Sequence, residues 1–178
     1  MPDVRRVPLP ALILGAALML AACGGADDVT EPLAASSPTP STSEPVDQDA
    51  AVKATFAGYV KAMATAIEQQ SADPLRPYAT DAWATGVIAQ YRANLWNKKK
   101  TIIGTNTVAS ATPTVTGETA TLEACVDSSN AFQVPLGTKA IRAGSSVTPL
   151  GRWRDRAELR LVDGSWKITT ITGGRQKC

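Results

Sequence analysis

Residues 152–172 read RWRDRAELRLVDGSWKITTIT, and this stretch decides the fold of the C-terminal half of the chain. Asp163-Gly164 is a two-residue signal for a tight β-hairpin turn. A turn at that dipeptide sets a register between the two arms. The register predicts a core face made of three cross-strand pairs, Val162 with Ser165, Leu161 with Trp166 and Leu159 with Ile168.

The opposite side of the same hairpin carries positive charge. We call the four arginines of this side the basic patch: Arg152, Arg154, Arg156 and Arg160. Arg160 is expected to lie directly opposite Lys167, and like charges in that position are destabilising. The patch is therefore interpreted either as a solvated sheet face or as a surface that binds an anionic partner.

The residues before this hairpin also predict antiparallel strands. Apolar residues alternate at Ala120, Leu122, Ala124 and Val126, and Thr116-Gly117 and Leu136-Gly137 are turn signals. Further upstream the period becomes helical. One apolar stripe, beginning near Asp47, comprises Val52, Phe56, Tyr59, Val60, Met63 and Ile67, and Asp73-Pro74 is expected to end that helix.

A second helix is predicted to begin at Thr80 or Asp81, either of which can cap it. Its apolar side comprises Trp83, Val87, Ile88, Tyr91 and Leu95, and its last turn is expected to hold Lys98 to Lys100. N-terminal helices followed by a run of antiparallel strands predict an α+β fold.

The first 46 residues differ from the rest in composition. Arg5 and Arg6 precede an almost wholly apolar run, Leu9 to Ala22, as in a secretory signal. The sequence Leu20-Ala21-Ala22-Cys23 resembles the lipobox of bacterial lipoproteins, which implies acylation of Cys23 and cleavage before it. A plain cleaved signal and an uncleaved membrane anchor are the alternatives, but the apolar run is shorter than the roughly 20 residues that span a bilayer.

The sequence therefore divides into three parts. Residues 1–22 are predicted to be the lipoprotein signal, 23–46 the lipidated cysteine with a disordered Ser/Thr/Pro-rich tether, and 47–178 the folded domain. Lipidation of Cys23 would place the chain on the extracytoplasmic face of the cell membrane, with the lipid bilayer as its first partner. An envelope protein or a cell-wall polymer is a further expected partner, and nucleic acid is not expected outside the cell.

Cys125 and Cys178 remain once Cys23 is assigned to lipid. A disulfide persists in an exported compartment, so we predict that these two cysteines are bonded. The chain contains no histidine, and two cysteines are too few ligands for zinc, so no metal site and no cofactor are expected.

Several of these features together resemble the nuclear transport factor 2-like lipoproteins of high-GC Gram-positive bacteria. They are the opening helix, the Trp83-to-Leu95 stripe, the hairpin ending in Gly164-Ser165-Trp166-Lys167-Ile168, and Ala124-Cys125-Val126-Asp127 with a late cysteine. The resemblance covers about Asp47 to Cys178. It implies a cone in which a curved antiparallel sheet wraps the helices, with a pocket at the open end.

Enzymes of this cone fold place acid or base side chains in the pocket, and here the candidates are Asp81, Asp127, Asp155 or a buried tyrosine. We interpret Asp81 as a helix cap, Asp127 as a strand-end or turn residue, and Asp155 as a surface partner of arginines. The candidates for contact with an apolar ligand are Trp83, Tyr91, Trp96 and Trp153, with Trp96 and Trp153 expected to be the most exposed. The alternative is that these aromatic side chains belong to the hydrophobic core, which is the more common role of such residues. The sequence thus favours a non-catalytic binding module; the alternative is a small-molecule isomerase, cyclase or dehydratase. The oligomeric state does not follow from the sequence.

Overall fold

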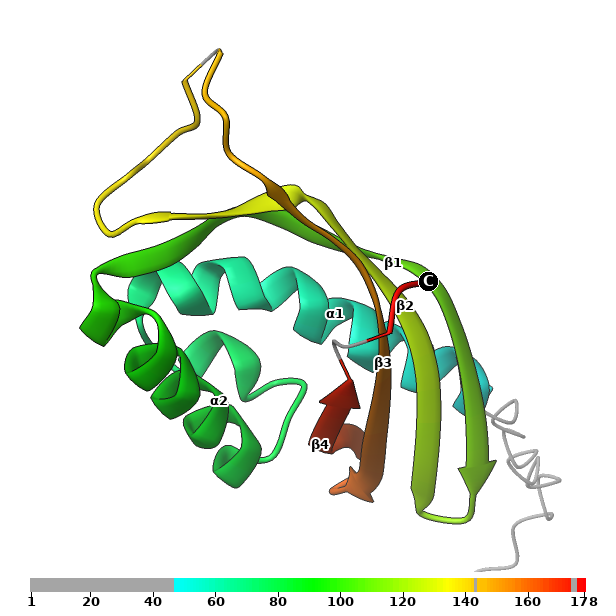
Figure 1. The fold of residues 1–178 in the computed structure, drawn as a ribbon. Coiled ribbons are helices and arrows are strands. Elements are labelled where there is room, and N and C mark those ends of the chain that lie inside the picture. The colour runs from blue at the N-terminus through cyan, green and yellow to red at the C-terminus, as the bar shows by residue number, and fades with distance from the viewer. Residues whose placement is uncertain (1–46, 143, 174–175) are drawn as a thin grey trace, which may run out of the picture. The chain divides into compact units, whose positions relative to one another are not determined.

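Helices packed on an antiparallel sheet make up the domain. The computed structural model describes residues 47–142, 144–173 and 176–178. Two α-helices, α1 (Gln48–Gln69) and α2 (Asp81–Asn94), are each followed by a short 3-10 helix, η1 (Asp73–Leu75) and η2 (Trp96–Lys98). The sheet curves around α1 (Figure 1). The predicted α+β class is confirmed, while the predicted signal, the Cys23 site and the tether lie outside the described residues.

Helix α1 forms where its apolar stripe predicts it. Asp47 caps its first turn by accepting a hydrogen bond from the Ala50 backbone N–H at 3.1 Å, and the stripe from Val52 to Ile67 is buried. The predicted end at Asp73-Pro74 is wrong. The helix ends at Gln69, because Gln70 adopts a left-handed conformation with φ 52° and closes the helix. Asp73 and Pro74 instead begin η1.

Helix α2 is capped by Thr80, whose hydroxyl accepts from the Trp83 backbone N–H. Asp81 is its first residue and pairs with Arg76. The predicted position of the lysines is wrong, since the helix ends at Asn94 and Lys98 lies in η2. Lys99 is left-handed with φ 56°, and Lys100 already begins the first strand. Trp96 begins η2 and is buried in the core.

The sheet is a meander of four strands in the order β1-β2-β3-β4. Their bounds are β1 (Lys100–Thr116), β2 (Thr119–Pro135), β3 (Pro149–Val162) and β4 (Ser165–Gly173). The predicted hairpin register is confirmed, with Leu159 opposite Ile168 and Leu161 opposite Trp166. The assignment of Val162 to the core face is wrong. Val162 is 37% exposed, because successive residues of a strand point to opposite faces and Leu161 takes the inner one.

Strand β4 also contacts the segment that links the two α-helices. The Ile168 N–H donates to the Tyr78 carbonyl, and the Ile168 carbonyl accepts from the Thr80 N–H, each at 2.9 Å. Lys167 faces Arg160 as predicted, but its Nζ donates to the carbonyls of Arg76 and Pro77 at 3.0 and 2.7 Å. These carbonyls offset the like-charge contact with Arg160, so this pair does not require an anion.

Candidate functional site

A cavity of about 550 Å³ lies between the two α-helices and the inner face of the sheet. Both α-helices and all four strands contribute residues to its wall. Three of the four predicted ligand-contact residues line it: Trp83 and Tyr91 of α2, and Trp153 of β3. The Trp153 indole is held by a hydrogen bond from its Nε1 to the Leu150 carbonyl at 2.6 Å. This cavity is the candidate functional site.

Trp96 departs from the prediction. It is only 5% exposed and belongs to the hydrophobic core, and it is not among the residues that line the cavity. Its ring lies near that of Tyr91, with 6.3 Å between the ring centroids. Trp96 therefore supports the wall behind Tyr91 and does not present its own indole to a ligand.

Asp155 also departs from the prediction, since it lines the cavity and not the outer surface. It lies between Trp153 and the buried Ala157, on the inward parity of β3, and is half-buried. The end of β4 approaches it closely. A Cβ on Gly173 would lie 2.7 Å from the Asp155 Oδ1 atom and 2.4 Å from the Arg154 carbonyl oxygen. Glycine at that position therefore lets β4 close the wall beside the carboxylate.

Two tyrosines share this cavity with Asp155. Burial raises the pKa of Tyr59 well above its usual value. The hydrogen bond from Trp83 opposes this increase in part, and the neighbouring Tyr91 and Asp155 add to it by smaller amounts. Burial also raises the pKa of Tyr91, and the negative charge of Asp155 raises it further by a smaller amount. Both phenols are therefore neutral near pH 7 and can donate hydrogen bonds.

The orientation of the Tyr59 phenol is set from α2. The Trp83 Nε1 atom donates a hydrogen bond to the Tyr59 hydroxyl oxygen at 3.3 Å. Because this bond uses the oxygen as an acceptor, the Tyr59 proton remains available for another acceptor. The cavity thus combines an apolar, aromatic wall with one carboxyl group and phenolic donors.

The other two acidic candidates lie away from the cavity wall. Asp81 pairs with Arg76 at the start of α2. Asp127 is on β2, and the Ser129 backbone N–H, the Ser129 hydroxyl and Arg152 hold the pKa of its carboxyl below the usual value. The lowered pKa makes Asp127 a weak base. Neither Asp81 nor Asp127 lines the cavity, so neither is placed to act on a molecule inside it.

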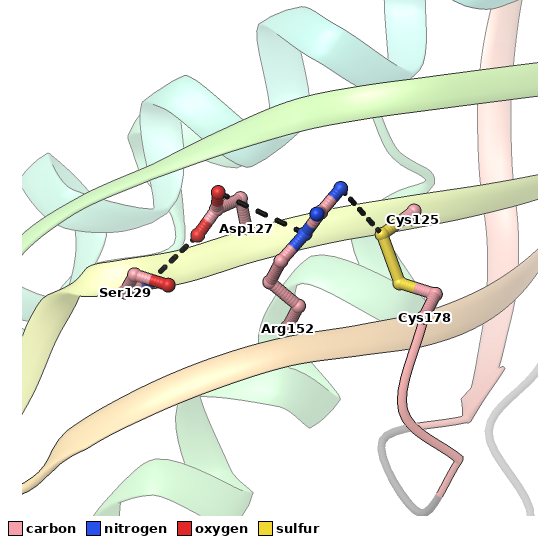
Figure 2. The surroundings of a disulfide bond; sticks show 5 residues. All are labelled: Cys125, Asp127, Ser129, Arg152 and Cys178. Carbon is pink, nitrogen blue, oxygen red and sulfur yellow. Dashed lines mark hydrogen bonds and ion pairs between the residues drawn. A yellow bond between two sulfur atoms is a disulfide. The ribbon is translucent and has the colours of Figure 1, made fainter.

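The disulfide and the basic patch lie on the outer side of the sheet. Cys125 and Cys178 are bonded, as the sequence predicts. Figure 2 shows Arg152 between this disulfide and Asp127; its guanidinium donates to the Cys125 sulfur at 3.5 Å and lies 3.8 Å from an Asp127 carboxylate oxygen. All four arginines of the patch are exposed, but Arg152 is held by these contacts. The patch is thus not a uniform row of solvated cations.

Sequence reasoning placed Asp155 on the surface, and it did not identify Tyr59 or the polar residues Gln90, Asn106 and Ser128 as parts of a site. A signal for Asp155 was present, because it has the same parity on β3 as Leu159 and Leu161, whose pairing predicts the core face. The arginines on either side made it look like a surface residue. Asn106 has the same parity on β1 as Ile102 and Val108, which pack against the core, but its polar side chain interrupts the apolar pattern and hides its inward position.

Within the described part of the chain, no three His, Cys, Asp or Glu residues form a group that could hold a metal ion. In the same residues, every helix is too short or too polar to cross a bilayer.

Comparison with known proteins gives matches among solved structures. No protein-family model and no curated protein matches this chain. A protein from Kribbella flavida is 14% identical over 72% of this chain and 91% of its own, with a TM-score of 0.48. An NTF2-like protein from Cytophaga hutchinsonii is 13% identical over 68% and 95%, with a TM-score of 0.42. An NTF2-like protein with a cystatin-like fold from Novosphingobium aromaticivorans is 12% identical over 68% and 79%, with a TM-score of 0.43. The function of this chain therefore has to be argued from its own residues.

Proposed function

We propose that this chain is an extracytoplasmic lipoprotein, anchored to the cell membrane through Cys23, whose nuclear transport factor 2-like cone binds a small, mainly apolar ligand. The Leu20-Ala21-Ala22-Cys23 sequence supports the anchor. The arrangement of a curved antiparallel sheet on two helices, with a cavity between them, supports the binding module.

The anchor is tested by mass spectrometry of the mature polypeptide isolated from its cells. The expected N-terminal residue is Cys23 carrying acyl chains, and Cys23→Ser is expected to shift the protein from the membrane fraction to the soluble fraction. A polypeptide that retains Met1 and a free Cys23 thiol would contradict the anchor.

One observation carries the binding function: a carboxyl group and a mainly apolar wall that includes several aromatic rings share a single cavity. Its volume, about 550 Å³, is within the roughly 300–1,000 Å³ range of small-molecule sites. Trp83, Tyr91 and Trp153 offer large apolar contact areas, whereas Asp155 offers an acceptor. The ligand that fits best is apolar over most of its surface and carries a cationic group or a hydrogen-bond donor for Asp155.

The variant Asp155→Asn tests the role of that carboxylate. We expect it to weaken binding of octylammonium at least about tenfold, since hydrogen bonds to charged groups contribute about 1.5–3 kcal/mol. Titration followed through the fluorescence of the cavity tryptophans measures the affinity. Binding of octanol should change much less, because octanol carries no charge.

Asp127→Asn is the matched control, since it removes the same charge from a residue outside the cavity wall. We expect it to leave octylammonium affinity within about twofold. If both variants lost the same affinity for octylammonium, the net charge of the protein and not the position of Asp155 would account for the binding of the cation. Absence of any binding by the unaltered chain would contradict the binding function as a whole.

A second candidate function is that of an isomerase, cyclase or dehydratase. The observation that favours it is the presence of Asp155 beside two phenols with raised pKa values, since a base and neutral hydrogen-bond donors are the groups that proton transfer requires. The two functions are distinguished by recovering the molecule that is bound to the protein in cells and incubating it with the purified protein. Chemical change of that molecule by the unaltered protein, but not by Asp155→Asn, would favour the enzyme.

A further inference from the structure

Asn106 of β1 lies opposite a bulge in β2. Thr105 pairs with Asn130 and Thr107 pairs with Asp127, so that Asn106 faces two residues of β2, Ser128 and Ser129. The extra residue is on β2, and Asn106 keeps the inward parity that it shares with Ile102 and Val108 of β1. Asn106 lines the cavity, together with Ser128 of β2, which is 7% exposed.

The Asn106 amide has an unused acceptor. Its Oδ1 atom is buried and has no hydrogen-bond partner among the described residues. Buried polar atoms in folded proteins are nearly always paired, so an orphaned one requires an explanation. A group on a molecule in the cavity would supply the missing partner.

Asn106 and Asp155 lie far apart on the wall of the same cavity. Asp155 pairs with Ala124 of β2, whereas the neighbour of Asn106, Thr107, pairs with Asp127 of β2. The backbones of Asn106 and Asp155 are therefore roughly 15 Å apart. This distance corresponds to three to four residues along a strand and two strand spacings across the sheet. The wall between them includes Val126 and Trp153, so the polar groups are separated by apolar surface.

A second cavity begins at Asn106. Its volume is about 430 Å³, and Ile67, Ile102 and Asn106 line both cavities. The orphaned amide thus lies on the wall that the two cavities share, where one end of a long ligand would come to rest.

We propose that Asn106 is a specificity-determining residue that accepts a hydrogen bond from the ligand, and that the ligand is an elongated apolar molecule with a hydrogen-bonding group at each end. This inference rests on the proposed binding function and adds the second polar contact. One end of the ligand is bound by Asp155 and the other by Asn106.

The octane α,ω-diol and octanol are the probes, because they differ only in the second hydroxyl group. We expect the unaltered full chain to bind the diol about tenfold more tightly than octanol. The variant Asn106→Leu should bind the two alcohols with nearly equal affinity. Titration by tryptophan fluorescence, checked by calorimetry, measures all four affinities.

Unfolding in urea without a ligand separates this role from a structural one. Asn106→Leu replaces an amide whose buried oxygen has no partner by an apolar group, so it should be at least as stable as the unaltered chain. A structural role for the amide predicts a loss of stability instead. Asn106→Ala, which adds no bulk, is the second variant and should also abolish the preference for the diol.

Equal binding of the two alcohols by the unaltered chain, or a diol preference that persists in both variants, would overturn the role of Asn106 alone. Failure of the unaltered chain to bind either alcohol or octylammonium would overturn the binding function, and this inference with it.

Discussion

Cys178→Ser is expected to lower the free energy of unfolding by about 4 kcal/mol. The disulfide joins residues 53 positions apart, and in the chain-entropy model a crosslink over a loop of that length removes about 4 kcal/mol of conformational freedom from the unfolded state. The bond also holds the last residues against β3, where the Arg154 N–H donates to the Gln176 carbonyl at 2.8 Å. Loss of the disulfide should release this segment.

Urea denaturation of the purified chain, followed by tryptophan fluorescence, measures the change. Reduction of the unaltered chain is the matched control and should give a loss of similar size, because it removes the same crosslink without a substitution. An unfolding midpoint that stays the same under reducing conditions would contradict the prediction. Cys23 is outside the crosslink, so Cys23→Ser should leave the midpoint unchanged.

Leu122→Ala is expected to cost about 3 kcal/mol of stability. Leu122 is 0% exposed and belongs to the core formed by the helices and the inner face of the sheet. The substitution removes the favourable free energy of burying the outer carbons of the leucine side chain, and it leaves a cavity. In comparable sites these two effects together lower the free energy of unfolding by about 2–5 kcal/mol. Its neighbours Pro113 and Ala157 are held in the strand ladder and can close little of that void.

Glu123→Ala is the matched control, since Glu123 is the next residue of β2 and is exposed on the outer face. It should change stability by no more than about 0.5 kcal/mol. Equilibrium unfolding of both variants measures the difference. Similar losses in the two would mean that β2 does not alternate between core and solvent as described.

Much of the local structure was predictable because it depends on neighbours in the sequence. Asp163 and Gly164 adopt positive φ angles of 49° and 72°, the conformation that a type I′ turn requires, and this turn sets the register of the hairpin. The stripe of α1 follows from the 3.6-residue period. The helix ends were predicted less well, because left-handed residues such as Gln70 and Lys99 carry no strong local signal.

The candidate site was predictable only in part, because it depends on contacts between residues that are far apart in the sequence. Trp83, Tyr91 and Trp153 were identified by residue type, but the same criterion selected Trp96, which is buried in the core. Asp155 was misjudged because its sequence neighbours are arginines, whereas its neighbours in space are Tyr59 and Tyr91.

The amino-acid sequence alone determines the order of helices and strands, the hairpin register and the N-terminal motif at Cys23, since each depends on residues that are close along the chain. The cavity is different. It exists only because the curved sheet and the two helices leave space between them, and its polar groups come from both helices and from β1, β2 and β3. Packing between distant segments brings Asn106, Asp155 and Tyr59 to one wall, and no local pattern contains that information.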